Sequence, residues 1–127
     1  MQKKEKIKVL IIEDDSYIME MYKIKFAYSG FEVISASDGE KGLKILEKER
    51  PDIILLDVIM PKKDGFSVLK EIKSKPAIKE IPVVLLTNLG QRENIEKGFE
   101  LGAVSYIIKA HFTPSEIVEK IKDALKK

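Results

Sequence analysis

The sequence predicts an α/β domain in which five parallel strands form a sheet with helices on both faces. Short runs of β-branched and other apolar residues alternate five times with longer amphipathic segments, which is typical of βα units and a parallel sheet. The apolar runs carry few polar residues, as strands buried on both faces require. A length of 127 residues fits one domain. We therefore expect a single domain over residues 1–127, with its core at about residues 7–125.

The first half of the chain provides two strands and two helices. Residues 7–12 form a nearly continuous apolar run and residues 31–36 form the second strand. The segment 16–28 has helical character and ends before Gly30, a residue that favours helix termination. The segment Ser37–Glu40 has the pattern of a capping box, with serine at the cap and glutamate three residues later. It predicts the start of the second helix.

The second half continues the alternation. We expect strands at residues 53–56, 83–86 and 104–108 and helices at residues 67–74 and 91–101. Residues 113–116, Thr-Pro-Ser-Glu, begin a last helix, with threonine at the cap, proline in the first turn and glutamate completing a capping box.

Composition excludes several classes of function. Basic and acidic residues number 23 and 21 and give a net charge of +2. The basic residues are spread over predicted helix faces, so we expect no direct binding to nucleic acid. Cysteine is absent, which excludes disulfides and thiolate chemistry. No apolar run reaches the length of about 18 residues that a membrane span needs. We expect a cytoplasmic protein without membrane contact.

Polar side chains follow four of the predicted strands where each strand ends. Glu13 and Asp14 follow the first strand, Asp57 the third, Thr87 the fourth and Lys109 the fifth. Ligands of open parallel sheets bind outside these carboxyl ends. Three clustered carboxylates are unfavourable unless a cation joins them, and Mg²⁺ or Mn²⁺ suits a small set of carboxylate oxygens. The sequence therefore predicts a divalent-metal site.

Structural roles are the alternatives at this edge of the sheet. Acids favour a helix N-terminus, so capping is the expected role of Asp15. Lys109 lies at a strand exit, where its ammonium group can reach an anionic oxygen, and the alternative is an ordinary surface lysine. Thr87 can donate its hydroxyl to an anionic oxygen or serve as a plain strand residue. For Tyr106, packing at the sheet edge is as good an interpretation as a site role.

Four stretches of the sequence carry a resemblance to a known family. They are VLIIEDD at Val9–Asp15, DIILLDVIMPKKDG at Asp52–Gly65, PVVLLT at Pro82–Thr87 and GAVSYIIK at Gly102–Lys109. In this order and spacing the chain resembles the response-regulator receiver domains of two-component signalling, including the stand-alone chemotaxis type. The resemblance covers about residues 7–125. It implies a flavodoxin-like sheet of order 2-1-3-4-5 with no effector domain attached.

The resemblance also implies a phosphoacceptor site. Asp57 would take a phosphoryl group from a phosphohistidine in a Mg²⁺-dependent reaction. Asp14, Asp57 and the backbone carbonyl of Ile59 would be the metal ligands, and Glu13 would act through water. Such a domain is a signalling phosphoacceptor rather than an enzyme, because it catalyses only its own phosphorylation and slow dephosphorylation.

Further implied roles concern the signal. Lys109 would pair with a phosphoryl oxygen, Thr87 would move to bond the phosphoryl group, and Tyr106 would follow as a rotameric switch. Pro61 and Gly65 would shape the loop beyond the site. The implied partners are a sensor histidine kinase or phosphotransfer protein and a downstream target protein. Dimerisation would use the face formed by the fourth helix, fifth strand and fifth helix.

The sequence departs from the family pattern at several positions. Ala110 follows Lys109 where most receivers have a proline preceded by a cis peptide bond, so either a costly cis bond is kept or the loop takes another path. Asn88 stands where a small residue is usual. Ile59 and Leu89 are apolar at positions that tune hydrolysis, and neither can orient an attacking water. We therefore predict a long-lived phosphoryl state.

Other functions fit the sequence less well. A phosphohydrolase that forms an aspartyl phosphate would need a second acid two residues after Asp57, where Ile59 stands. A flavin carrier would need a Ser-, Thr- and Gly-rich phosphate loop where Glu13–Asp15 stand. An unphosphorylated binding module remains open because of Ala110 and Asn88. His111 is expected to be a loop residue, and the lysines of residues 120–127 a solvated helix face.

Overall fold

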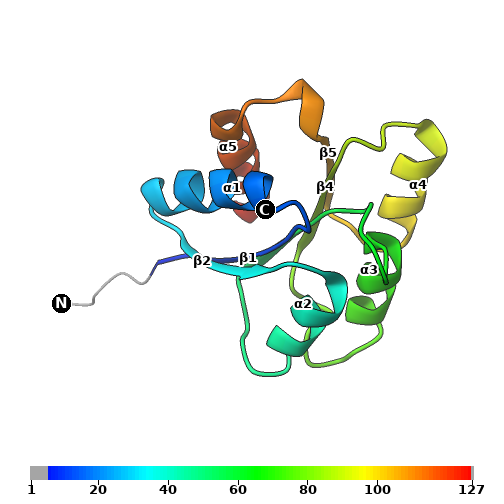
Figure 1. Cartoon of the computed structure of the whole chain (residues 1–127). Coiled ribbons are helices and arrows are strands. Elements are labelled where there is room, and N and C mark those ends of the chain that lie inside the picture. The colour runs from blue at the N-terminus through cyan, green and yellow to red at the C-terminus, as the bar shows by residue number, and fades with distance from the viewer. Residues whose placement is uncertain (1–5, 127) are drawn as a thin grey trace.

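The computed structural model describes residues 6–126, so the ends of the expected 1–127 domain, residues 1–5 and 127, lie outside it. Five parallel strands form one sheet in the order β2-β1-β3-β4-β5, which confirms the predicted class and strand order (Figure 1). The strands are β1 (Lys8–Ile12), β2 (Glu32–Ala36), β3 (Ile53–Leu56), β4 (Val83–Thr87) and β5 (Ser105–Ile108).

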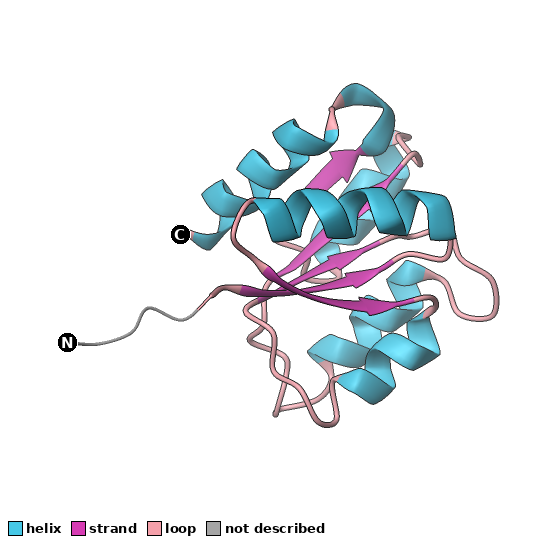
Figure 2. Ribbon diagram, turned by 60° about the vertical axis from the view of Figure 1, so that its left-hand side comes forward, coloured by secondary structure: helices cyan, strands magenta, loops and turns pink. Residues whose placement is uncertain are grey.

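Helices cover both faces of the sheet (Figure 2). They are α1 (Ser16–Tyr28), α2 (Gly39–Ile45), α3 (Gly65–Lys73), α4 (Arg92–Glu100) and α5 (Pro114–Leu125), and a single 3-10 turn (Lys109–His111) precedes α5. α1 and α5 pack on one face, and α2, α3 and α4 lie on the other (Figure 1). None of the helices between residues 6 and 126 is both long enough and apolar enough to cross a membrane.

The strands bury side chains on both faces. Val9 and Ile11 pack with α1 and α5, whereas Leu10 and Ile12 pack with the cluster of α2 and α3. Successive strand residues point to opposite faces, so the apolar run of β1 serves two cores. The central strands are thereby fixed from both sides, and the residues that follow them have a rigid base.

Two helix starts differ from their predictions. Ser37 was expected to cap α2, but Asp38 is the cap, and its carboxylate accepts a hydrogen bond from the Lys41 N–H at 2.8 Å. Serine and aspartate cap a helix about equally well. α2 packs closely at its first residue, Gly39, where a Cβ would lie 2.5 Å from the Val68 side chain. Likewise α3 begins at Gly65 rather than at Ser67, because Asp64 caps it.

The other caps agree with the sequence. Asp15 accepts hydrogen bonds from the N–H groups of Tyr17 and Ile18 at the start of α1, and Thr113 forms the expected capping box with Glu116. The expected 91–101 helix is one residue shorter at each end, since Gln91 and Leu101 are its flanking residues.

Candidate functional site

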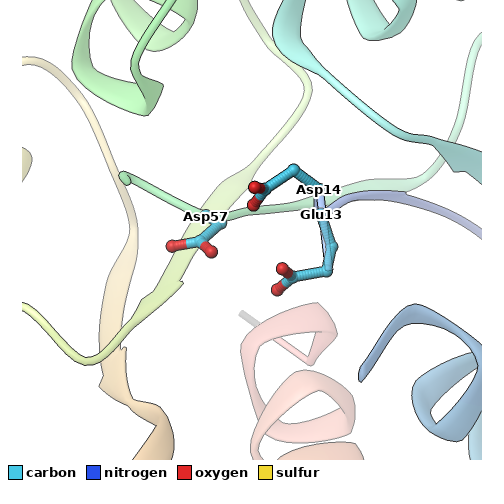
Figure 3. A group of neighbouring side chains, drawn as sticks. All are labelled: Glu13, Asp14 and Asp57. Carbon is cyan, nitrogen blue, oxygen red and sulfur yellow. The ribbon is translucent and has the colours of Figure 1, made fainter. Parts of the chain in front are cut away.

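Three carboxylates meet at the carboxyl edge of the sheet (Figure 3). Glu13 and Asp14 follow β1 and Asp57 follows β3; these neighbouring strands end at the same level because Ile12 pairs with Leu56. One carboxylate oxygen from each residue lies within 4.8 Å of the others. Glu13 and Asp57 are buried and Asp14 is exposed. We call these three residues the acidic cluster.

Backbone contacts hold Asp57 in place. The Gly65 N–H donates a hydrogen bond to the Val58 carbonyl at 2.8 Å, which brings the start of α3 against the end of β3. A Cβ at position 65 would lie 2.2 Å from the Asp57 carbonyl oxygen, a distance that no side chain tolerates. Glycine is therefore required here by close approach, in agreement with the expected role of Gly65 in shaping this loop.

Lys109 points into the acidic cluster. Its Nζ donates hydrogen bonds to Glu13 Oε1 at 2.6 Å and to Asp57 Oδ2 at 2.9 Å, and its side chain is only 11% exposed. Burial acts to lower the pKa of Lys109, but the two carboxylates outweigh it and leave that pKa raised. Lys109 is therefore a firmly protonated cation in the site, as expected of a site lysine rather than a surface one.

Glu13 is the most enclosed acid of the cluster. Burial raises its pKa, and the hydrogen bonds from Lys109 and from the Asp15 N–H only partly oppose this effect. Both Glu13 oxygens are thus engaged by this chain, Oε1 by Lys109 and Oε2 by Asp15. Even so, three carboxylates face one ammonium group, which leaves the cluster with an excess of negative charge.

A second group of residues lies at the end of β4. Thr87 is fully buried, and its Oγ1 accepts a hydrogen bond from the Leu89 N–H at 3.3 Å. The Tyr106 hydroxyl donates to the Leu89 carbonyl. The Tyr106 ring packs on α4 at Gly98, where a Cβ would lie 3.0 Å from it. Thr87 and Tyr106 are thus tied to one residue, Leu89, and we call the three the Leu89 group.

The family comparison agrees with this geometry. The model of the response regulator receiver domain matches residues 9–122. The chain belongs to this family. The chain is 37% identical to the probable transcriptional regulator ycf27 of Guillardia theta over 96% of its own length and 46% of that protein. This receiver domain therefore spans about half the length of the curated relatives it matches.

Solved receiver structures resemble it closely. The chemotaxis protein CheY4 of Vibrio cholerae has a TM-score of 0.89 at 29% identity, covering 94% of this chain and 99% of that one. The phosphorylated cyanobacterial phytochrome response regulator RcpA has a TM-score of 0.85 at 30% identity, covering 97% of this chain and 96% of that one. Both confirm the flavodoxin-like fold.

The acidic cluster of this receiver domain fits a hard divalent cation. All its side-chain donors are oxygens, and they carry more negative charge than Lys109 neutralises. Mg²⁺ prefers such ligands and keeps several waters, which the exposed position of Asp14 permits. Glu13, Asp14 and Asp57 each offer a carboxylate oxygen that could hold it. His111 does not contribute, since it is exposed in the 3-10 turn and the acidic cluster does not include it.

The loop after Lys109 turns without a cis peptide bond. Within residues 6–126 no cis peptide bond occurs, and residues 109–111 form the 3-10 turn. The Ala110 N–H donates a hydrogen bond to Asn88 Oδ1 at 2.8 Å. Sequence reasoning missed this contact, although an asparagine beside the fourth strand and a free N–H in place of proline were both visible.

Proposed function

We propose that this receiver domain accepts a phosphoryl group on Asp57 from the phosphohistidine of a sensor histidine kinase or phosphotransfer protein. The reaction uses Mg²⁺ or Mn²⁺, and the product signals to a downstream protein. The observation that carries this proposal is the Lys109 ammonium group, which bridges Glu13 and Asp57 inside a cluster with surplus negative charge. That arrangement supplies an acceptor oxygen and a fixed cation side by side.

Transfer needs placement and charge neutralisation more than covalent work by the protein. An Asp57 carboxylate oxygen attacks phosphorus, the bond between phosphorus and the donor imidazole nitrogen breaks, and the imidazole leaves with the electron pair and takes up a proton. Lys109, 2.9 Å from Asp57 Oδ2, neutralises a phosphoryl oxygen as the bond forms. A divalent metal held by the acidic cluster would supply further positive charge to the site.

The proposed metal ligands are Asp14, Asp57 and the backbone carbonyl of Ile59. Glu13 supports the metal through water, as the family resemblance implies. Both of its oxygens accept hydrogen bonds within this chain, and so do both oxygens of Asp57. Asp14 has no such engagement and is exposed, which suits a direct ligand that also borders solvent.

The proposed switch uses the second group of residues. Thr87 exchanges its bond with the Leu89 N–H for one to a phosphoryl oxygen, and Tyr106 follows. Both residues are joined to Leu89, so a movement of Thr87 changes the environment of the Tyr106 hydroxyl. The exchange replaces a neutral hydrogen bond by a stronger one to a charged oxygen, which gives the two-state element that signalling requires.

A protein donor fits the surface beside the acidic cluster. α1 begins next to the cluster and exposes Tyr17, Met21, Ile24 and Tyr28, which recur on one helix face at intervals of four, three and four residues. A donor that brings a phosphohistidine to Asp57 reaches over this end of α1. We therefore assign this stripe to an apolar helix face of the donor and place the chain in the cytoplasm with it.

The output side is proposed on the face of α4, β5 and α5, as partner surface or dimer contact. Phe99 of α4 and Val104, which precedes β5, are about half exposed there, and Tyr106 lies in β5. We propose no direct contact with nucleic acid or membrane.

Chemical mapping tests the acceptor. The protein is incubated with acetyl phosphate and Mg²⁺ and then reduced with borohydride, which converts an aspartyl phosphate to homoserine. We expect homoserine at position 57. Homoserine at Asp14 or at no position in folded protein would contradict the proposal, and the latter result would favour an unphosphorylated binding module.

A further inference from the structure

We propose that Asn88 is a positioning residue for Lys109, an inference that rests on the proposed function. The two residues belong to different loops, one after β4 and one after β5. They are linked through the bond from the Ala110 N–H to Asn88 Oδ1.

The bond lies where the sheet ladder stops. The pairing of β4 with β5 ends at Thr87 and Ile108. The two segments that follow these residues are no longer paired with each other. Asn88 reaches across this gap with its side chain and binds the backbone two residues past Ile108. The side-chain amide thus extends the connection between the two strands by one step, at the position where Lys109 leaves the sheet.

The bonded N–H belongs to the peptide unit that joins Lys109 to Ala110. Because a peptide unit is planar, holding this N–H fixes the plane directly after the Lys109 Cα. The ladder fixes the chain before it, up to Ile108. Lys109 is therefore held from both sides, and its flexible side chain starts from a fixed point on its way to Glu13 and Asp57.

The backbone of residues 109–111 makes few hydrogen bonds of its own. The 3-10 turn of residues 109–111 has no side-chain cap, and its closing bond from the Phe112 N–H to the Lys109 carbonyl is long at 3.3 Å. Ala110 and His111 are exposed. Asn88 is also not needed as a helix cap, since Gln91 occupies that position of α4. The Asn88 amide oxygen is therefore the side-chain acceptor that anchors the turn.

The residue type at position 110 makes this hydrogen bond possible. Alanine keeps a backbone N–H, whereas proline would have none to donate. Asn88 and Ala110 therefore act as a pair, and the loss of either partner removes the bond. An exposed hydrogen bond competes with water, so we expect a modest effect on Lys109 rather than a loss of the fold.

The test compares Asn88→Leu, which keeps the bulk and loses the acceptor, with Asn88→Asp, which keeps an acceptor oxygen. Nuclear magnetic resonance follows hydrogen exchange of the Ala110 amide and the ammonium signal of Lys109. In Asn88→Leu we expect Ala110 exchange to rise about threefold to tenfold, the range that one net hydrogen bond supplies, and the Lys109 signal to broaden. Asn88→Asp should keep Ala110 protected.

Phosphorylation by acetyl phosphate with Mg²⁺ shows whether the effect runs through Lys109. Asn88→Leu should slow phosphorylation about threefold to tenfold when Lys109 is present. In a Lys109→Ala background the same substitution should change the rate by less than about twofold, the scatter of independent sites. Equal slowing in both backgrounds, or unchanged Ala110 and Lys109 signals in Asn88→Leu, would overturn the inference.

The proposed function and the positioning role of Asn88 can fail independently. If the unsubstituted protein takes no phosphoryl group but Asn88→Leu alters both magnetic resonance signals, the proposed function fails and the positioning link stands. If the protein is phosphorylated normally but the signals do not respond to Asn88→Leu, the link fails and the proposed function stands.

Discussion

The acidic cluster and the Leu89 group lie at the same edge of the sheet but are held differently. The cluster follows β1 and β3, and each of these strands has a neighbour on both sides. Within the Leu89 group, Thr87 ends the central strand β4 and is fully buried. Tyr106 belongs to β5, which pairs with β4 alone in the described sheet and is mostly half-buried. The proposed acceptor therefore lies at the rigid centre of the fold, and Tyr106 of the proposed switch lies at its margin.

The contacts of the two regions differ in the same sense. Asp57 is packed against backbone, so closely that position 65 has no room for a Cβ. Thr87 and Tyr106 are tied by single hydrogen bonds to Leu89, each worth about 1 kcal/mol net. Chemistry that depends on exact placement is thus built where movement is expensive. Signalling that depends on movement is built where a few weak bonds can be exchanged.

The largest expected effect comes from substitution of Asp14, the proposed metal ligand of the acidic cluster. Asp14→Asn should lower the affinity for Mg²⁺ by at least about 100-fold, since loss of mere supporting groups already costs about 10–100-fold. Titration calorimetry measures this directly. Asp15→Asn is the matched control, because asparagine caps a helix as well as aspartate and Asp15 serves as the α1 cap. Equal losses in both variants would mean that general charge, not ligation, binds the metal.

The next effect tests the rigidity of the centre. Gly65→Ala forces a Cβ onto the Asp57 carbonyl and should lower the free energy of unfolding by at least about 2 kcal/mol. Gly90→Ala is the control. Its Cβ would lie 3.1 Å from the tip of the Ile108 side chain and 4.0 Å from the Asn88 carbonyl oxygen, and we expect a change below about 1 kcal/mol. If urea denaturation gave the same loss of unfolding free energy for both variants, the proposed difference in rigidity between centre and margin would be wrong.

A smaller effect concerns the lifetime of the phosphoryl group. Ile59 is 59% exposed, so Ile59→Asn should leave the core intact while it supplies a side chain that can orient water. We expect hydrolysis of the phosphorylated protein to become about tenfold faster, below the range typical of acid–base assistance. The decay of the phosphorylated mass measures this rate, with Ile59→Val as control. Fast hydrolysis in the unsubstituted protein would refute the predicted long lifetime.

The smallest expected effect concerns Tyr106, at the margin of the sheet. Tyr106→Phe removes the hydroxyl that donates to the Leu89 carbonyl and should lower the free energy of unfolding by about 1 kcal/mol. Phosphorylation by acetyl phosphate should proceed at the unsubstituted rate, because Tyr106 does not belong to the acidic cluster. A rate that fell together with stability would show that the two regions are not separable.

Most of the site was predictable because strand order fixes it. Once the apolar runs are placed as parallel strands, the residues that follow them must meet at one edge. Lys109, Asp57 and Glu13 come together for this reason, although 96 residues separate Glu13 from Lys109. The alternation of apolar and amphipathic segments is enough to place these strands, because it is a local property of the sequence.

Other contacts depend on loop paths that no local pattern encodes. The bond from Ala110 to Asn88 requires two loops to turn toward each other, and Lys73 donates to the carbonyls of Lys79 and Ile81 across a third connection. The shift of the α2 cap from Ser37 to Asp38 shows the same limit, because two adjacent residues both suit the cap and tertiary packing selects one.

The central claim is that Asp57 accepts a phosphoryl group with the help of a divalent metal. Intact mass after incubation with acetyl phosphate tests it most directly, with Mg²⁺ or with chelator, for the unsubstituted protein and for Asp57→Asn. The account predicts one added phosphoryl group that requires Mg²⁺ and is absent from Asp57→Asn. Addition to Asp57→Asn, or no addition to the folded unsubstituted protein with Mg²⁺, would contradict it.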